Sequence, residues 1–458
     1  MREVGCLVLL SVVVGCGSGT GDGDGDGDGA TTSTTTSTTT STSTSTTTSA
    51  TATASSSVTA DTGADATGDA STSTSTSSST TTETGTDTGE PSWPKACDDL
   101  YDPAVLPTFE LTLSDAELDG LQSDCEQGLQ NYRPVAFSYD GETVDAMVRL
   151  KGNWSWSCEK YQFVISFNEV DPAGRFHGLR KIMLDAPWYD RTLLHERMAF
   201  PLFAALGLPY SCVNSARLML NGAYYGLYSN VERIDQEYLE RNFEESEGNL
   251  YQGGSELKTN EAANDTTNRD ALFAATTVEE LDVLMDLDQA VAEWAAEAMI
   301  PAMDNYWAGV EINYYLYDHP SRGFVYLPYD LDISFGDSAY GDGSLVWPDT
   351  LSSDPITYEH PGWLKEPLLQ LVLADPTWCE RFVEELGNAR AAYSPEGMAA
   401  QLAEWDAQIA DAVAQDQHKT FSTADHDAAV ADLQEFFAAR AEVVDAWLAE
   451  GDHCPAQW

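Results

Sequence analysis

Basic residues are scarce in this chain. Its 458 residues include 22 lysines and arginines against 75 aspartates and glutamates, which gives a formal net charge of −53 at pH 7. A surface of this sign repels nucleic-acid phosphates and anionic lipid headgroups. The composition therefore excludes a nucleic-acid-binding protein. It favours general solubility or adaptation to a salty medium over a specific basic partner.

Long hydrophobic runs are missing as well. The apolar stretch at residues 4–14 is too short to span a bilayer as a helix. It follows a charged start and precedes Gly15-Cys16, a pattern typical of an export signal. Residues 13–16 also resemble a bacterial lipobox. We predict a signal peptide over residues 1–16 and a lipid anchor to the membrane at Cys16, with an ordinary signal peptide as the alternative.

Core-forming side chains are nearly absent from residues 17–93. A Gly-Asp alternation fills residues 21–29, and the rest of the segment is rich in Ser and Thr. Such a segment cannot bury enough apolar surface to offset the entropy of ordering, so we predict a disordered linker. The Gly-Asp run is not a calcium loop, because Ser33 stands where that loop requires a bidentate glutamate.

Several catalytic signatures are missing too. The seven histidines show no metal-binding spacing, and Ala199 stands where a zinc protease would place a second histidine after His195-Glu196. The patterns Gly-x-Ser-x-Gly, Gly-x-Gly-x-x-Gly and His-Arg-Asp do not occur. These absences exclude a zincin, an α/β-hydrolase and, by motif, an ordinary protein kinase.

Cysteines are present in a number that suggests pairing. Cys6 and Cys16 belong to the export signal, and the other six show no Cys-x-x-Cys spacing: Cys97, Cys125, Cys158, Cys212, Cys379 and Cys454. An even number in an exported chain favours disulfides over metal ligation. We expect Cys454 to hold the C-terminal tail to the body, while the spacing leaves the connectivity open.

Residues 94–458 are predicted to fold as one α+β domain. The β-rich N-terminal part contains two hairpin signals, Asp140-Gly141 and Asn221-Gly222, each between strand-like segments. The C-terminal part is helical from residue 363 onward. Helices are predicted by apolar spacing and capping residues at 114–121, 191–206, 288–303 and 436–448.

Carboxylates and an amide gather in the stretch 304–336. Asp304 ends the helix 288–303, Asn313 opens a strand, and Asp330 and Asp332 lie on the returning strand, where alternation would turn both to one side. Oxygen ligands of this kind suit Mg²⁺ or Mn²⁺. In protein kinases a catalytic Asp, an Asn and a metal-binding Asp follow in this order. We predict metal ligation by Asp332, Asn313 and Asp330, with Asp304 as catalytic base.

This stretch resembles the CotH kinase family, the atypical kinases of the spore coat protein H type. The similarity covers roughly residues 105–450 and rests on Asn-Tyr-Tyr-Leu-Tyr at 313–317, Tyr-Asp-Leu-Asp at 329–332, Phe335-Gly336, and earlier segments at 149–153, 184–196, 220–228 and 248–251. It implies an atypical kinase-like fold that uses ATP with Mg²⁺ or Mn²⁺. Residues 308–312 lack a histidine that some relatives carry there.

A kinase also needs a cation on the phosphates, commonly a lysine held by a glutamate. We assign Lys160 to the phosphates and Glu196 to holding it, with Lys151 as the rival lysine. The alternative for each lysine is a solvated surface residue. Basic residues are so few in this chain that two lysines on neighbouring predicted strands favour a functional role for one of them.

Three functions remain open from the sequence. The first is an extracytoplasmic protein kinase that phosphorylates Ser or Thr of surface or envelope proteins, its own linker included. The second is a catalytically inactive surface, structural or adhesion protein of the same fold, which the scarcity of ATP outside the cytoplasm favours. The third is calcium-dependent carbohydrate binding, which requires a metal effect without a nucleotide effect.

Overall fold

The computed structural model describes residues 94–152, 155–187, 189–309, 312–336, 351–356 and 367–454. The predicted signal peptide, the lipobox Cys16 and the predicted linker lie outside these residues. So does residue 363, where the helical part was predicted to begin.

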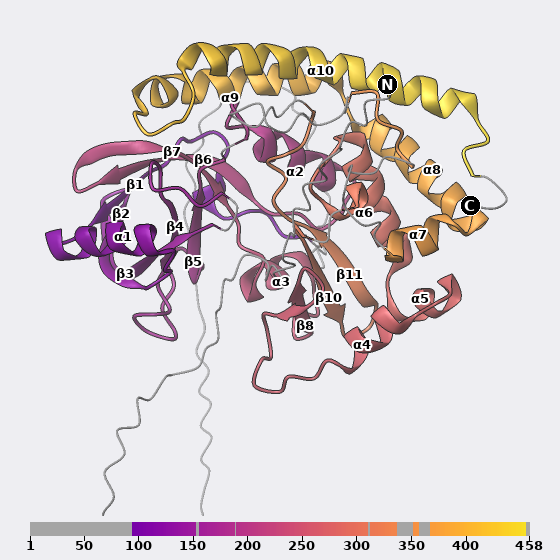
Figure 1. Cartoon of the computed structure of the whole chain (residues 1–458), viewed down its shortest axis with the longest axis horizontal. Helices are drawn as coiled ribbons and strands as arrows, with labels where there is room; N and C mark the ends of the chain where they lie inside the picture. The colour runs from indigo at the N-terminus through magenta and orange to yellow at the C-terminus, as the bar shows by residue number, and fades with distance from the viewer. Residues whose placement is uncertain are drawn as a thin grey trace, which may run out of the picture. The chain divides into compact units, whose positions relative to one another are not determined.

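The first half of the described chain forms a closed β-barrel (Figure 1). Its strands are β1 (Thr108–Thr112), β2 (Arg133–Tyr139), β3 (Glu142–Lys151), β4 (Gln162–Ser166), β5 (Lys181–Asp185), β6 (Val213–Leu220) and β7 (Ala223–Val231). They follow the order β1-β2-β3-β4-β5-β7-β6, and the barrel closes where β1 pairs in parallel with β6. The other neighbouring strands pair antiparallel.

Both predicted hairpins are confirmed. Asp140 and Gly141 have φ angles of 46° and 82°, and Asn221 and Gly222 have φ angles of 50° and 77°. Two successive residues with positive φ make a turn whose twist matches the flanking strands. Asn and Asp tolerate this conformation and glycine adopts it freely, which is why these dipeptides predict the turns correctly.

Large apolar side chains fill the barrel, among them Phe109, Phe137, Phe163 and Leu218. The helix α1 (Asp115–Gln127) packs against β2 and β3. Its predicted N-cap is confirmed, because the Ser114 hydroxyl accepts the backbone N–H of Glu117 at 3.3 Å. The helix is longer than the predicted 114–121 and ends at Gly128 in the left-handed conformation.

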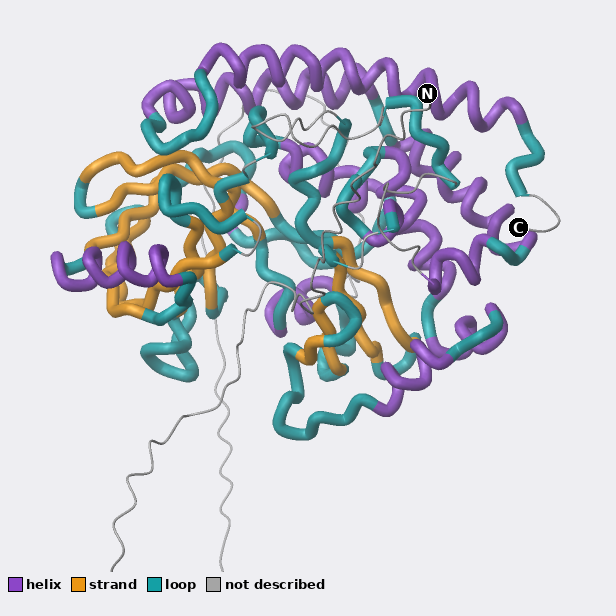
Figure 2. The backbone as a smooth tube through the Cα atoms, viewed as in Figure 1, coloured by secondary structure: helices purple, strands orange, loops and turns teal. Residues whose placement is uncertain are grey.

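The second half combines a smaller sheet with packed helices, and Figure 2 shows the two sheets as separate groups of strands. The strand order is β11-β10-β8-β9, with bounds β8 (Asn249–Gln252), β9 (Glu256–Leu257), β10 (Tyr314–His319) and β11 (Gly323–Pro328). The helices are α2 (His195–Ala205), α3 (Gln236–Asn242), α4 (Thr267–Ala274), α5 (Val278–Leu284), α6 (Leu287–Met299), α7 (Pro367–Leu373), α8 (Pro376–Ala392), α9 (Pro395–Gln415) and α10 (Thr423–Glu450). Short 3₁₀ turns occur at Asp99–Tyr101 and Tyr306–Ala308.

The helix α6 lies at the centre of this half. It packs against α8 and β11, and most of its side chains, including Trp294, are buried. The long helices α9 and α10 lie side by side (Figure 1), and α9 also contacts β7 of the barrel. The expected α+β fold class is therefore confirmed, with a β-rich N-terminal part and a mainly helical C-terminal part.

The helix predicted at 191–206 begins four residues late, at His195. The carboxylate of Asp190 accepts the backbone N–H groups of Thr192 and His195, each at 2.7 Å, and Leu193 has a φ of 58°. These contacts hold residues 190–194 as a structured loop before the first helical turn.

The predicted strand that would carry both late aspartates is wrong. β11 ends at Pro328, and Asp330 lies beyond it with a φ of 56°. A left-handed residue breaks the alternation of side chains, so the same-face argument does not apply. The segment is fixed instead by α6, because Phe335 N–H donates to Ile300 O at 2.7 Å and Met303 N–H donates to Ile333 O at 2.9 Å.

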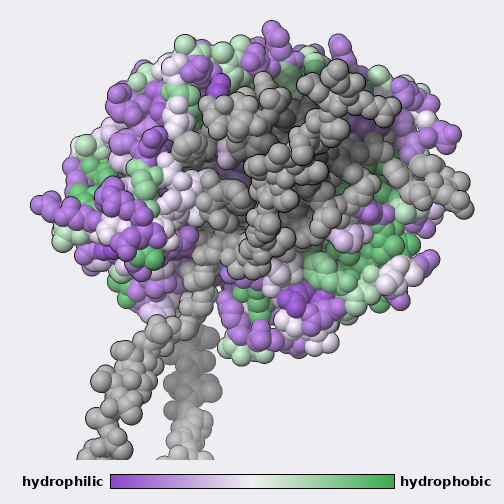
Figure 3. All heavy atoms as spheres, viewed as in Figure 1, coloured by the Kyte–Doolittle hydropathy of each residue, from purple (hydrophilic) through white to green (hydrophobic). Residues whose placement is uncertain are grey.

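Three disulfides form: Cys97–Cys212, Cys125–Cys158 and Cys379–Cys454. The expected role of Cys454 is confirmed, since it ties the C-terminal tail to α8. Disulfides of this kind indicate an oxidising compartment. Among the described residues, none of the helices has both the length and the hydrophobicity needed to cross a membrane. Hydrophilic side chains are spread over the face in Figure 3.

Candidate active site

Three loops meet at the end of α6: the turn after the helix, the approach to β10 and the segment after β11. The buried amide of Asn305 joins them, because its Nδ2 donates to Asn313 O and Tyr329 O, both at 2.9 Å. The backbone N–H of Tyr329 also donates to Asn313 O at 3.1 Å. Neutral hydrogen bonds therefore fix the loops that carry the acids.

Asp304 and Asn313 contact each other directly. Asp304 lies in the turn after α6, five residues beyond the last helical residue, Met299. The amide Nδ2 of Asn313 donates to Asp304 Oδ2 at 2.8 Å. Asp304 Oδ1 is buried and has no hydrogen-bond partner among the described residues. Burial and the charge of Asp330 raise the pKa of Asp304 well above its usual value.

Asp332 belongs to the same group of charges. Burial raises its pKa well above the usual value, and repulsion from Asp330, Asp304 and Glu196 adds to the effect. Glu196 lies in the first turn of α2, and burial followed by the charges of Asp330 and Asp185 raises its pKa in the same way. The four predicted acids, which are far apart in sequence, thus lie near one another.

Lys151 is the lysine of this site. It ends β3, and its Nζ donates to the carboxylate of Asp185 at the end of β5. Lys151 also opposes the rise in the pKa of Glu196, so its charge lies close to that carboxyl group. The residue that the sequence offered as the rival therefore has the surroundings that we predicted for Lys160.

Lys160 does not pair with Glu196 as predicted. Its buried Nζ donates to Asp416 Oδ2 at 2.8 Å and to Leu227 O at 2.6 Å, and it lies 4.8 Å from the ring centre of Tyr228. Asp416, directly after α9, also accepts Leu227 N–H at 3.0 Å. Lys160 precedes β4 and faces β7 and α9, so it connects the barrel to the helical half.

Sequence reasoning missed three residues around the predicted site. Asp185 is the last residue of β5 and Asp190 follows this strand, and both carboxylates add to the negative charge near Glu196. His195 places its Nδ1 at 2.9 Å from Asp332 O and packs its ring edge-on against Phe335. In the sequence, their position near the end of a predicted strand and next to Glu196 could have indicated a role in the site. Only the fold shows that they lie close to the Asp332 segment.

The site holds many more acids than bases. One lysine, Lys151, lies among six carboxyl groups: Asp185, Asp190, Glu196, Asp304, Asp330 and Asp332. Mutual repulsion, raised carboxyl pKa values and the orphaned Asp304 Oδ1 all fit a site that takes up a hard divalent cation. The amide oxygen of Asn313 suits the same ion, because its Nδ2 is already directed at Asp304.

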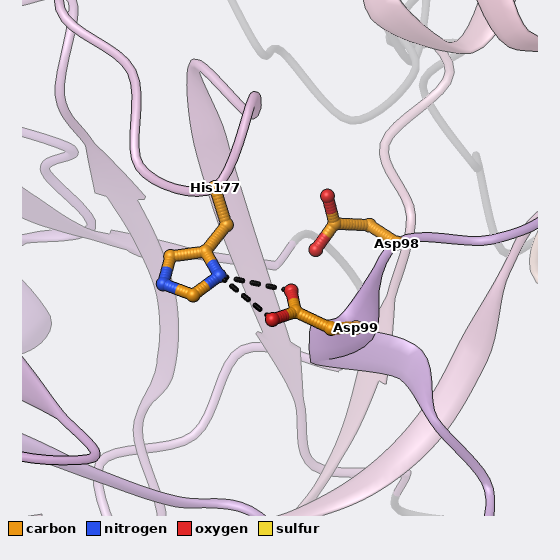
Figure 4. A group of neighbouring side chains, drawn as sticks. All are labelled: Asp98, Asp99 and His177. Atoms are coloured by element: carbon orange, nitrogen blue, oxygen red, sulfur yellow. Dashed lines mark hydrogen bonds and ion pairs between the residues drawn. The ribbon is translucent and has the colours of Figure 1, made fainter. Parts of the chain in front are cut away.

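These acids are not packed as tightly as a preformed metal site. Within the described ranges, a single group of three His, Cys, Asp or Glu residues brings ligand atoms within 4.8 Å of one another, namely Asp98, Asp99 and His177 (Figure 4). A nucleotide-linked cation needs few protein ligands, because phosphate oxygens and water supply the others. The looser spacing at Asp332 therefore agrees with a shared ion.

The histidine in Figure 4 contacts acids on both sides of its ring. His177 Nδ1 lies 2.9 Å and 3.0 Å from the two oxygens of Asp99, and its Nε2 lies 3.7 Å from Glu142. Burial lowers the pKa of His177, but the hydrogen bond and charge of Asp99 outweigh it and give a net rise. Burial and the hydrogen bond to Asp99 raise the pKa of Asp98 to about 6. The contacts of His177 with Asp99 and Glu142 account for the closeness of these side chains without a bound metal.

Comparisons with known proteins identify the family. The family model of the CotH kinase protein matches residues 148–444, which include all seven predicted site residues. The inner spore coat protein H of Bacillus subtilis (strain 168) is 24% identical over 266 residues, covering 52% of this chain and 71% of that protein.

A solved structure is similar at greater distance. It is the Helicobacter pylori proinflammatory kinase CtkA, with 11% identity and a TM-score of 0.33, covering 70% of this chain and 92% of that one. At this score the likeness supports no statement about function. The family model matches well over half of the chain, and the chain therefore belongs to the CotH kinase protein family.

Proposed function

We propose that the chain is an atypical, metal-dependent protein kinase that acts outside the cytoplasm. It would transfer the γ-phosphoryl group of ATP to Ser or Thr of a protein. The observation that carries the proposal is the convergence of Lys151, Glu196, Asp304, Asn313 and Asp332 from separate elements. This set provides a cation, a base and oxygen ligands, which are the parts that phosphoryl transfer uses.

Asp304 is the proposed base. The amide of Asn313 holds Asp304 Oδ2 at 2.8 Å, which leaves Oδ1 to accept the proton of the attacking hydroxyl. The raised pKa of Asp304 favours proton uptake once a neighbouring cation restores its charge. Lys151, held by Asp185, would contact the phosphates, and Glu196 would balance its charge.

Asp332, Asn313 and Asp330 would hold Mg²⁺ or Mn²⁺. When bound, the ion would neutralise charge on the ATP phosphates. The chain's own part is to keep these ligands in place before the ion arrives. Asn305 does so by bridging the loops, and His195 does so by contacting the backbone of Asp332.

A non-catalytic structural role in a coat or envelope is the second candidate. It is favoured by the name of the relative, inner spore coat protein H, and by three disulfides that suit an exposed surface. Under either function we propose an exported protein that is anchored through Cys16. Under the first, protein substrates include the chain's own Ser/Thr-rich linker.

Thermal melting with ATP and Mn²⁺ or Mg²⁺ tests the proposal, with Asp332→Ala and Asp304→Ala as variants. A ligand at about a hundred times its dissociation constant adds roughly 2.7 kcal/mol to the free energy of unfolding. We expect a shift in the parent and none in Asp332→Ala. In Asp304→Ala, nucleotide should still bind while mass spectrometry finds no phosphate on the protein. An equal shift in parent and Asp332→Ala would contradict the metal assignment.

A further inference from the structure

A cavity of about 150 Å³ lies next to the segment that follows Asp332, because Phe335 and Gly336 are part of its lining. The loop before α2, the residues after β11 and the side of α10 enclose it. Its wall includes Tyr189, Arg191, His195, Phe335, Asp432 and Phe436. The cavity thus combines one cation with aromatic side chains, next to a segment of the candidate active site.

Arg191 is exceptional among the cations of this chain. Every other described lysine or arginine has a hydrogen bond, an ion pair or an aromatic ring as partner. For Arg191 the described structure shows no such contact of its side chain, although acids outnumber bases more than threefold. It is half-buried, and its charge acts on Asp425 across the cavity without an ion pair.

The position of Arg191 is fixed by its backbone. Its carbonyl oxygen lies 2.9 Å from Nδ1 of the buried His426 on α10, and His426 Nε2 lies 2.9 Å from Asp406 on α9. On the other side, Asp190 caps the start of α2. An arginine that is positioned at a cavity wall and lacks a partner suits an anionic ligand, because its planar fork matches phosphate or carboxylate oxygens.

The size and the charge of the cavity limit the kinds of ligand that it can bind. Pockets for whole small molecules start at roughly 300 Å³, so this cavity holds one side chain rather than a nucleotide. Asp425 and Asp432 also line the cavity and repel any anion, so an anionic ligand must gain apolar contact as well. Phe335, Phe436 and Leu433 offer that contact. A phosphate that is attached to a short carbon chain satisfies both conditions.

We propose that Arg191 and this cavity bind a phosphorylated serine or threonine side chain of a protein partner, and that binding steadies the segment carrying Asp332. The link runs through His195, which lines the cavity and places Nδ1 at 2.9 Å from Asp332 O, and through Phe335 in the same wall. The choice of a phosphorylated side chain rests on the proposed kinase function, which produces this chemical group.

The test measures binding of a fluorescent alanine-rich peptide with one phosphothreonine to the full chain, without ATP or metal. The unphosphorylated peptide and inorganic phosphate are the comparison ligands. We expect the phosphopeptide to bind, and to bind at least about tenfold more weakly to Arg191→Met, since hydrogen bonds to charged groups are lost. Arg175→Met, which removes an ion pair with Glu237 of α3 away from the cavity lining, is the matched control and should bind like the parent.

Asp432→Asn tests the cavity independently, in case Arg191→Met does not fold. Removing this exposed rim charge should tighten phosphopeptide binding, because it removes repulsion. Equal binding of both peptides, equal binding to parent and Arg191→Met, or phosphate binding as strong as phosphopeptide binding would each overturn the proposal.

A second measurement separates this proposal from the kinase proposal. Saturating phosphopeptide should tighten Mn²⁺-ATP binding severalfold in the parent, because coupling between two sites is reciprocal. Phosphopeptide binding without any ATP binding would sink the kinase function and keep the binding site. ATP binding without phosphopeptide binding would sink only the site at Arg191.

Discussion

Two buried lysines of the barrel differ in the charges around them. Lys160 has one acid, Asp416, which lies at 2.8 Å and accepts further backbone N–H groups. Burial raises the pKa of Asp416, but Lys160 and these donors outweigh it, so its pKa is lowered. Lys151 lies among an excess of acids, three of which have strongly raised pKa values, namely Glu196, Asp304 and Asp332.

This difference separates a structural ion pair from a candidate site. In a balanced buried pair each charge compensates the other, and removing one partner costs stability because it leaves the other charge buried and uncompensated. An unbalanced group costs free energy until a ligand of opposite charge arrives, so its cost is a sign of function. The sequence alone does not distinguish Lys151 from Lys160 in this respect.

The largest effect is expected for Lys160→Met. It leaves Asp416 buried without its cation, which should cost roughly 3–5 kcal/mol of unfolding free energy. Urea unfolding measures it, and adding Asp416→Asn should restore part of the loss. At temperatures where the variant is folded, the Mn²⁺-ATP shift should persist. A loss of less than about 1 kcal/mol would place Lys160 among ordinary surface pairs.

Asp332→Asn should differ from Lys160→Met, because it should lose ligand binding and keep its stability. In the absence of metal the variant should be at least as stable as the parent, because one repelling charge is gone. With Mn²⁺-ATP the parent should gain roughly 2.7 kcal/mol and the variant nothing. Differential scanning calorimetry with and without ligand gives both numbers. If metal-free Asp332→Asn melted well below the parent, the charge of Asp332 would be compensated within the protein, as the charge of Asp416 is.

Glu297 on α6 is a third kind of buried acid, satisfied by hydrogen bonds rather than by a cation. It accepts Tyr326 O–H at 2.7 Å and Trp307 N–H at 3.1 Å, and burial raises its pKa to about 8. Because the folded-state pKa lies above the usual 4.5, its stabilising contribution is complete below pH 4.5 and is lost as pH rises to 8.

Glu297→Gln should remove this pH dependence. The slope in question is at most about 1.4 kcal/mol per pH unit for one group. Glutamine keeps both contacts, because its oxygen accepts from Trp307 while its amide donates to Tyr326. Melting curves of parent and variant from pH 5 to 8 test this. Parallel pH profiles would show that Glu297 titrates near its usual pKa.

The smallest effect is expected for His177→Gln on the barrel surface. Its ion pair with Asp99 is exposed, and such pairs contribute roughly 0.2–1 kcal/mol. The folded-state pKa of His177 is raised, so this contribution is present below pH 6.5 and is lost as pH rises through the folded value. Thermal melting at pH 5.5 and 8.5 should show a difference between parent and variant at the lower pH only. Mn²⁺-ATP binding should be unchanged.

Local sequence signals were sufficient where one short segment decides the structure. Asp140-Gly141 and Asn221-Gly222 adopt positive φ whatever surrounds them, and Ser114 caps the helix that follows it. The motif order from Asn313 to Gly336 was also sufficient for the family, because it needs no distances. Site residues Asp304, Asn313 and Asp332 were placed together by the same order.

Other predictions failed where distant residues decide. The segment around Asp330 has the sequence of a strand, but two hydrogen bonds hold it as a loop at the end of α6. Met303 N–H donates to Ile333 O, and Phe335 N–H donates to Ile300 O. The predicted pairing of Lys160 with Glu196 failed because its partner, Asp416, is 256 residues away in the sequence. No local pattern contains that contact.

By itself the sequence determined the turns, the helix cap, the acidic character and the family, since each depends on neighbouring residues or on their order. The tertiary structure alone decided which lysine is balanced, which acids are crowded and which arginine makes no hydrogen bond, ion pair or ring contact with the described residues. The physical reason is that a buried charge is governed by every charge within a few ångströms, and burial and distance arise only when the chain is folded.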